Sequence, residues 1–247
     1  MRPVRSLALA ALAFGLLSAP AFAIVGGRPA DADLKAETAM IVSTRGASCT
    51  GVVLAPNVLL TAAHCVQPAA DYAVVVFEPA GPRLIPASRI AVHPGFDPAS
   101  FDTRRPTPDL ALVKLSAALP GDFRPATLTG EIALPARRTA FTLAGFGVVK
   151  DGDGKSAGTL RMVDLPSIGT TGGIMVRLSA DNSTGSAAAG GCTGDSGGPV
   201  LLDGAVAGII GWSTAAGGAR GCGGVTGATL VGPQRPWIDA TLRAMGK

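Results

Sequence analysis

Residues 194–199 read GDSGGP and place a single serine, Ser196, between glycines and directly after an aspartate. Glycine adopts backbone conformations with positive φ that a side chain would block. A loop of this composition can turn sharply and point backbone N–H groups into one small space. A nucleophilic serine needs such a loop, because its hydroxyl must be exposed and donors must stand where an oxyanion forms. The segment therefore predicts a fold that carries a nucleophilic serine on a tight loop.

The two histidines of the chain narrow the class of hydrolase. The G-x-S-x-G pattern also fits the nucleophile elbow of α/β-hydrolases, in which the histidine follows the serine. Here His64 and His93 both precede Ser196, which excludes that class. His64 stands in TAAHC at 61–65, shortly after the apolar run 51–54. A serine nucleophile in this chain must therefore use a histidine from upstream.

The acid that completes a triad is expected at Asp109, which opens the apolar segment DLALVKL at 109–115. His, Asp, Ser is one of the known orders for a catalytic triad. Asp31 and Asp33 precede His64, so a subtilisin-type order of Asp, His, Ser is formally open. Asp109 fits better, because its apolar surroundings predict burial against the histidine.

With these segments in hand, the chain resembles the trypsin/chymotrypsin-like serine protease family. IVGG at 24–27 is similar to the mature N-terminus of that family. TAAHC at 61–65, DLAL at 109–112 and GDSGGP at 194–199 are similar to its three catalytic segments. The similarity runs in order from Ile24 to the segment around Trp237, which is nearly the whole mature chain.

The resemblance implies an all-β fold of two six-stranded antiparallel β-barrels with a C-terminal helix. The expected division is a signal peptide at 1–23, an N-terminal barrel at 24–125, and a C-terminal barrel with the helix at 126–247. The barrels would hold the site in the cleft between them. The first would supply His64 and Asp109, and the second Ser196.

The resemblance also assigns roles to single residues. Ser196 is the expected nucleophile, His64 the general base and acid, and Asp109 the residue that orients the imidazole. Backbone N–H groups of Gly194 and Ser196 would form the oxyanion hole. The α-amino group of Ile24 and the carboxylate of Asp195 would form the activation pair. The expected substrate pocket is lined by Gly190, Gly191, Gly211, Trp212, Ser213 and Gly224.

Three differences from the family pattern lie in or near that pocket. The segment that usually reads Ser-Trp-Gly is Gly211-Trp212-Ser213, so no hydroxyl at 211 supports the triad aspartate. The pocket-floor position that is Asp in trypsin falls on Gly190. An uncharged pocket predicts apolar or small side chains before the scissile bond rather than Lys or Arg. Residues 214–220 form a longer segment than is usual in the family.

Four cysteines allow three disulfide pairings, and the resemblance selects Cys49–Cys65 and Cys192–Cys222. The first bridge would join the turn that carries His64 to the strand before it, and the second would join the nucleophile loop to a wall of the substrate pocket.

No metal is expected, because the chain lacks Cys-x-x-Cys and His-x-x-x-His spacings. A calcium interpretation of DGDG at 151–154 is weaker than a solvated turn, because too few ligands follow. No cofactor is expected.

Residues 1–23 are typical of a secretory signal peptide. Arg2 and Arg5 supply the positive start, residues 7–17 an apolar core, and Ala21-Phe22-Ala23 a small-x-small cleavage pattern. The apolar run is too short for a membrane anchor. The sequence therefore predicts a secreted protein, extracellular or periplasmic, with no membrane attachment after cleavage and with disulfides. The expected cut follows Ala23, and the alternative is a cut after Ala21.

Charge and periodicity agree with this interpretation. Loss of Arg2 and Arg5 with the leader lowers the formal net charge from +4 to +2, which does not indicate nucleic acid as a partner. The expected partners are protein or peptide substrates and protein protease inhibitors, and the expected state is a monomer.

Short apolar runs at 72–77, 110–115 and 206–212 predict strands. The spacing of the apolar residues in 237–245 predicts an amphipathic helix.

Two features are expected to play no part in catalysis. His93, in Val-His-Pro, resembles a strand end of the family. Asn182 opens an Asn-Ser-Thr sequence that matches a glycosylation acceptor, a weak motif.

The rival to an endopeptidase is an inactive relative that acts as a binding protein. Such relatives typically lose a triad member or an oxyanion glycine, and this chain has them all.

Overall fold

The computed structural model describes residues 24–100, 105–130, 134–180 and 189–246. The predicted signal peptide at 1–23 and the glycosylation motif at Asn182 lie outside the described residues. Within the described part of the chain, no helix is both long enough and apolar enough to cross a membrane.

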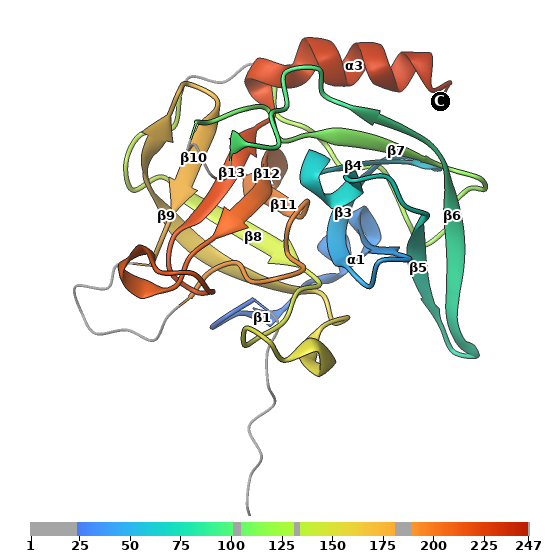
Figure 1. The fold of residues 1–247 in the computed structure, drawn as a ribbon, viewed down its shortest axis with the longest axis horizontal. Coiled ribbons are helices and arrows are strands. Elements are labelled where there is room, and N and C mark those ends of the chain that lie inside the picture. The colour runs from blue at the N-terminus through green and yellow to red at the C-terminus, as the bar shows by residue number, and fades with distance from the viewer. Residues whose placement is uncertain (1–23, 101–104, 131–133, 181–188, 247) are drawn as a thin grey trace, which may run out of the picture.

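The first half of the chain forms a closed antiparallel barrel, seen on the right of Figure 1. Its strands pair in the order β2-β3-β4-β7-β6-β5. They are β2 (Thr38–Ser43), β3 (Ser48–Ala55), β4 (Val58–Thr61), β5 (Tyr72–Glu78), β6 (Gly81–Val92) and β7 (Ala111–Leu115). The short apolar segments predicted at 72–77 and 110–115 are strands β5 and β7.

The second half forms a second closed barrel, in which β8 pairs with both β9 and β11. Its strands are β8 (Ala140–Gly145), β9 (Arg161–Thr171), β10 (Met175–Leu178), β11 (Pro199–Leu202), β12 (Ala205–Ser213) and β13 (Thr226–Leu230). The predicted strand at 206–212 lies within β12. The two six-stranded barrels confirm the predicted fold class. The predicted boundary at 125/126 falls between β7 and β8 and stays a prediction.

The helices in the described part of the chain are short. They are α1 (Ala32–Glu37), η1 (Ala63–Val66), η2 (Gly154–Ser156), η4 (Ala216–Gly218), η5 (Gly232–Gln234) and α3 (Arg235–Ala244). Asp31 caps α1 by accepting a hydrogen bond from the backbone N–H of Leu34 at 2.9 Å. Proline at the start of α3 suits a helix N-terminus, where the missing N–H has no intrahelical partner. The predicted closing helix is confirmed as α3.

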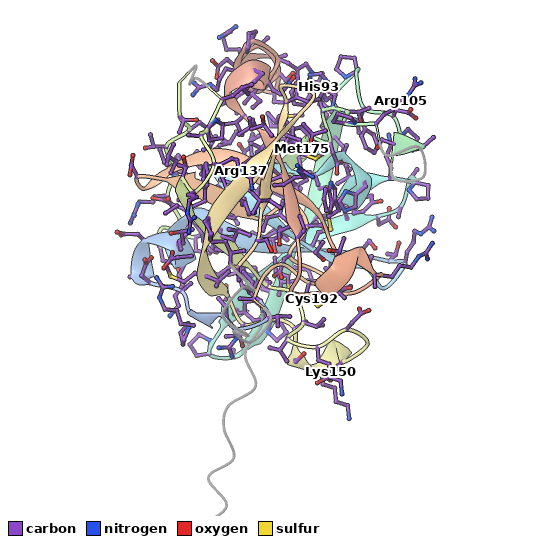
Figure 2. The ribbon with its side chains drawn as sticks, turned by 90° about the vertical axis from the view of Figure 1, so that its left-hand side faces the viewer. His93, Arg105, Arg137, Lys150, Met175 and Cys192 are labelled. Carbon is purple, nitrogen blue, oxygen red and sulfur yellow. A yellow bond between two sulfur atoms is a disulfide. The ribbon has the colours of Figure 1, made fainter. Side chains whose placement is uncertain are left out.

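Each end of the chain packs on the barrel that the other half of the chain builds. The two-residue strand β1 (Arg28–Pro29) pairs with β9 of the second barrel. In the opposite direction, α3 lies against the first barrel (Figure 1) and buries Ile238 in its core cluster. The ring of Trp237 meets the ring of His93 edge-on, with the ring centroids 4.6 Å apart. Figure 2 labels His93 near the top of the view. The Lys114 ammonium of β7 donates a hydrogen bond to the carbonyl of Met245.

Two apolar clusters fill the structure. One occupies the first barrel and extends under α3 and onto Phe146 and Met162 of the second half. The other fills the second barrel and includes Ile24, which is 0% exposed. The near-continuous apolar sequence of β7 follows from this arrangement, because the barrel interior covers one face of the strand and the C-terminal segment packs on the other.

Candidate active site

His64 and Asp109 meet at one end of the first barrel. His64 lies in η1, which follows β4 directly, and Asp109 stands two residues before β7, the strand that pairs with β4. The imidazole Nδ1 and Asp109 Oδ2 are 2.7 Å apart, and Asp109 Oδ1 accepts the backbone N–H of His64 at 3.0 Å. The carboxylate is buried and therefore orients both the ring and the backbone of the histidine. This arrangement keeps a proton on Nδ1 and leaves Nε2 able to accept one.

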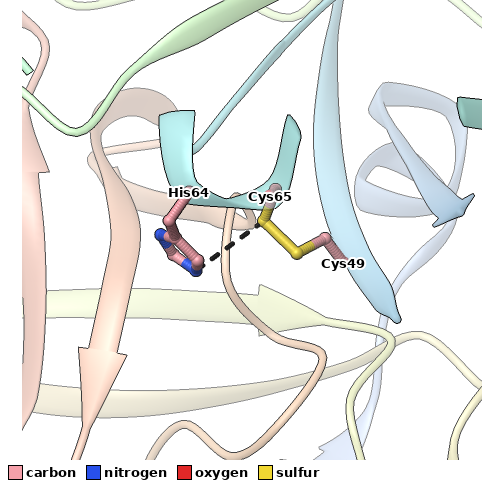
Figure 3. Close-up of side chains that lie close together, drawn as sticks. All are labelled: Cys49, His64 and Cys65. Atoms are coloured by element: carbon pink, nitrogen blue, oxygen red, sulfur yellow. Dashed lines mark hydrogen bonds between the residues drawn. A yellow bond between two sulfur atoms is a disulfide. The ribbon is translucent and has the colours of Figure 1, made fainter. Parts of the chain in front are cut away.

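The second ring nitrogen of His64, Nε2, lies beside the first disulfide. Figure 3 shows the ring next to the Cys49–Cys65 bridge, with Nε2 3.8 Å from Cys65 Sγ. A group of His64 with two cysteine sulfurs has the spacing of a metal site. Both sulfurs are bonded to each other, so they cannot act as thiolate ligands. The group of Asp151, Cys192 and Cys222 fails in the same way.

Both disulfides implied by the resemblance form, Cys49–Cys65 and Cys192–Cys222, and none of the described cysteines is free. The second bridge holds the start of the nucleophile loop, which Figure 2 marks at Cys192. Two glycines shape this loop. Gly194 has a φ of +97° and Gly197 one of +83°, which favour glycine, and neither position has room for a Cβ. The glycine pattern of the sequence therefore has a steric cause.

Two of the three predicted triad residues, His64 and Ser196, line the same cavity as the predicted oxyanion residue Gly194. His64, Gly194 and Ser196 all border a pocket of about 400 Å³ between the two barrels. Ser196 is half-buried, and its carbonyl oxygen accepts the backbone N–H of Thr50 from the first barrel at 2.8 Å. The serine and the histidine thus come from different barrels and share one solvent-accessible space. This is the arrangement that nucleophilic catalysis by Ser196 requires.

Asp195 is fully buried behind the loop. Its Oδ1 accepts the N–H of Gly147 and its Oδ2 that of Cys192, both at 2.8 Å. Gly145 and Gly147 press against the carboxyl group, and a Cβ at either position would collide with it. Burial raises the pKa of Asp195 to about 7, although the two backbone N–H groups act to lower it. The carboxyl group therefore holds its proton far more strongly than an exposed aspartate and is only partly ionised at neutral pH.

The expected N-terminal partner lies in the second barrel. Ile24 is in the apolar cluster of that barrel, and Val25 forms an antiparallel bridge with Gly190, with hydrogen bonds of 3.0 and 3.1 Å. The segment that follows the predicted cleavage point is therefore docked beside the nucleophile loop. The pairing of the Ile24 amine with Asp195 stays a prediction.

Two of the expected substrate-pocket glycines, Gly190 and Gly191, lie beside a residue that the sequence did not reveal, Thr226. Its hydroxyl oxygen accepts the N–H of Gly191 at 2.9 Å, and a Cβ at Gly190 would lie 3.1 Å from the same oxygen. A Cβ at Gly190 would also lie 3.3 Å from the Gly224 carbonyl oxygen. Thr226 is 0% exposed. Glycines and one buried hydroxyl therefore pack together here.

The other expected substrate-pocket residues, Gly211, Trp212 and Ser213, lie on β12 and contact different neighbours. Ser213 borders the cavity that contains Ser196. A Cβ at Gly211 would lie 3.3 Å from Asp109 Oδ2, so this position stands next to the triad carboxylate and offers it no hydroxyl. The ring of Trp212 covers Gly227, where a Cβ would collide with it. Position 227 is therefore restricted to glycine by this ring.

The titration of Asp195 predicts a pH-dependent stability of the chain that retains its leader. The folded-state pKa is about 7, above the usual 3.8. Folded protein therefore binds more protons than unfolded protein between these values, and the free energy of unfolding is expected to fall as pH rises from about 4 to about 7. Urea unfolding of the Ser196→Ala full chain at pH 5 and pH 8 measures this. Asp195→Asn should remove most of the difference, whereas an unchanged pH dependence in that variant would contradict the assignment.

Comparison with known proteins gives a consistent result. The family model described as Trypsin matches residues 24–238. Serine protease 56 of Homo sapiens is 36% identical over 169 residues, which are 62% of this chain and 27% of that protein. The chain thus spans about a quarter of that relative. Granzyme M of Rattus norvegicus is 28% identical over 245 residues and 89% of both chains.

Solved structures share the same architecture. The structure titled human heparin binding protein has a TM-score of 0.72 and 24% sequence identity. The match covers 89% of this chain and 97% of that one. At this level of identity the likeness shows the fold, with its two barrels and closing helix.

Proposed function

The chain belongs to the trypsin family of serine proteases, and from this premise we propose that it is a secreted serine endopeptidase. The observation that carries the proposal is the buried Asp109 carboxylate, 2.7 Å from His64 Nδ1, beside a cavity that His64 shares with Ser196 and Gly194. Family membership gives the general activity. The arrangement of these residues supports the same activity for this chain.

The mechanism follows from the proposed roles. Ser196 Oγ attacks the carbonyl carbon of a peptide bond while His64 Nε2 accepts the hydroxyl proton. The N–H groups of Gly194 and Ser196 stabilise the oxyanion that forms. The C–N bond then breaks as His64 donates the proton to the leaving amine, which leaves an acyl-enzyme at Ser196. Water, deprotonated by His64, attacks the acyl group, and the proton returns to Ser196 Oγ.

A serine-directed organophosphate tests the proposal directly. The wild-type protein should be labelled once per chain, and Ser196→Ala should abolish the label. Labelling also separates an enzyme from an inactive relative that serves as a binding protein, because the latter would have no activated serine. A folded protein that neither reacts with the reagent nor hydrolyses any member of a peptide library would refute the proposal.

The proposed specificity is for apolar or small side chains before the scissile bond. Gly190, Gly191 and Thr226 carry no charge, and a substrate cation buried against them would lose its hydration without a partner. We expect matched peptides with Leu, Phe or Ala at this position to be cleaved faster than those with Arg or Lys. Competitive profiling of kcat/KM on such a set is the measurement. Faster cleavage after Arg than after all three would disprove it.

Removal of the leader is proposed to activate the enzyme. Ala21-Phe22-Ala23 abuts Ile24, so one cut after Ala23 would create an ammonium at Ile24. That ammonium would pair with Asp195, which is otherwise buried with no cation in contact among the described residues. N-terminal sequencing of the active, secreted protein should give Ile24. Any other start, including Phe22, would contradict the proposal.

A further inference from the structure

Thr50 connects the first barrel to the loop that carries Ser196. It follows Cys49 in β3 and is 0% exposed. Its backbone N–H donates to the carbonyl of Ser196 at 2.8 Å. Its hydroxyl donates to the carbonyl of Gly194 at 2.9 Å and accepts the N–H of Phe146 at 3.0 Å. One buried residue of one barrel therefore holds three backbone groups of the other.

Thr50 is itself held in place. Its own carbonyl oxygen accepts the hydroxyl of Thr61 at 2.7 Å, from the strand that leads to His64. Strand β3 pairs with β2 on one side and with β4 on the other. Every polar group of Thr50 thus has a partner, and the residue has little freedom to move.

The two carbonyl groups that Thr50 binds belong to the two residues whose N–H groups form the proposed oxyanion hole. In each residue, N–H and C=O stand on either side of one Cα, so anchoring the carbonyl limits rotation of the residue. Gly194 needs such an anchor most, because it has no side chain and lies at a φ of +97°. Donors in an oxyanion hole stabilise a transition state only when their direction is fixed beforehand.

We propose that Thr50 is a positioning residue whose hydroxyl fixes the direction of the Gly194 N–H in the oxyanion hole. Thr50 touches no reacting atom and acts through the loop. The inference rests on the proposed endopeptidase function, because it assigns a task within that reaction. It differs from a purely structural role, in which the hydroxyl would only satisfy buried backbone groups and removal would lower stability alone.

The test compares three variants with the wild type. Thr50→Val keeps the shape and removes both hydroxyl hydrogen bonds, and Thr50→Ser restores them. Thr38→Val is the matched control. Thr38 lies in β2 of the same barrel, is 1% exposed, and its hydroxyl has no hydrogen-bond partner among the described residues. End-point titration with an organophosphate gives the concentration of competent enzyme in each preparation.

We expect Thr50→Val to lower kcat by about tenfold to a hundredfold with little change in KM, since loss of a whole oxyanion donor costs about 10² to 10³. The inhibition constant of a peptide trifluoromethyl ketone, whose oxygen occupies the oxyanion hole, should rise by a similar factor. Thr50→Ser should restore both values to within about threefold of wild type. Thr38→Val should leave kcat and the inhibition constant unchanged.

Unchanged kcat per titrated site in Thr50→Val, with only a lower Tm, would overturn the inference and leave the proposed function intact. Equal losses of substrate and ketone affinity with kcat unchanged would overturn it as well. If Thr50→Val does not fold, Thr50→Ala removes the same hydroxyl with a smaller side chain, and the same criteria apply. Absence of hydrolysis by folded wild-type protein would instead refute the proposed function, and the inference would fall with it.

Discussion

Ser196→Ala is expected to lower the turnover number by about 10⁴- to 10⁶-fold while leaving the protein folded, and His64→Ala should have an effect of the same order. The members of a triad act as a unit, so loss of the nucleophile or of its base removes nearly the whole contribution. Ser196 is half-buried on a loop held by other residues, so its truncation should hardly alter the fold. Single-turnover and steady-state assays on purified variants with matching thermal transitions measure the effect.

The chain offers matched controls for both substitutions. His93 is the second of its two histidines and packs on Trp237, away from the cavity. His93→Ala should lower thermal stability and retain turnover. Ser116 is exposed after β7, and Ser116→Ala should change neither property. Near-normal hydrolysis by folded Ser196→Ala protein would show that another residue is the nucleophile.

Asp109→Asn is expected to lower the turnover number by about 10⁴-fold, the second largest effect. The carboxylate accepts two hydrogen bonds, one from His64 Nδ1–H and one from the backbone N–H of His64. The amide has the same shape, but only its oxygen can accept, so its NH₂ group must face one of these two donors. If the amide oxygen stays on the backbone N–H, Nδ1 must become the acceptor. The proton then moves to Nε2, which can no longer accept the proton of Ser196.

The comparison for this variant is Asp122→Asn, an exposed position whose charge change is the same. It should retain full activity. Circular dichroism and the thermal transition of Asp109→Asn should resemble those of the wild type, so the loss can be assigned to the tautomer. A loss below about tenfold in the folded Asp109→Asn protein would exclude Asp109 as the residue that orients His64.

Short motifs with steric causes could be predicted from the sequence. Gly194 and Gly197 are glycines because the loop needs positive φ and close backbone contact, and this requirement is visible in the letters GDSGGP. The triad order, the two disulfides and the closing helix were predicted on similar grounds. Each of these features depends on neighbours in sequence or on the family resemblance.

Contacts between distant segments could not be predicted in this way. Thr50 and Gly194 are 144 residues apart, and a threonine in an apolar strand is an ordinary strand residue. Thr226 and Gly191 are 35 residues apart, and nothing near Thr226 distinguishes it from other threonines. The enclosure of Asp195 by Gly145 and Gly147 could not be predicted from the sequence either, because it depends on how two segments of the second barrel pack.

The first barrel is covered by α3, and the second barrel pairs with β1, so each depends on a segment from the other half of the chain. This arrangement affects when during synthesis the chain can fold. The first barrel leaves the ribosome early, yet the helix that covers it, α3, is made only after the strands of the second barrel. The second barrel likewise recruits β1 from the opposite end. A nascent chain that lacks α3 would thus expose apolar surface on the first barrel and could not complete its packing. The same interlock predicts that separately made halves, cut between β7 and β8, would gain a defined structure only when mixed.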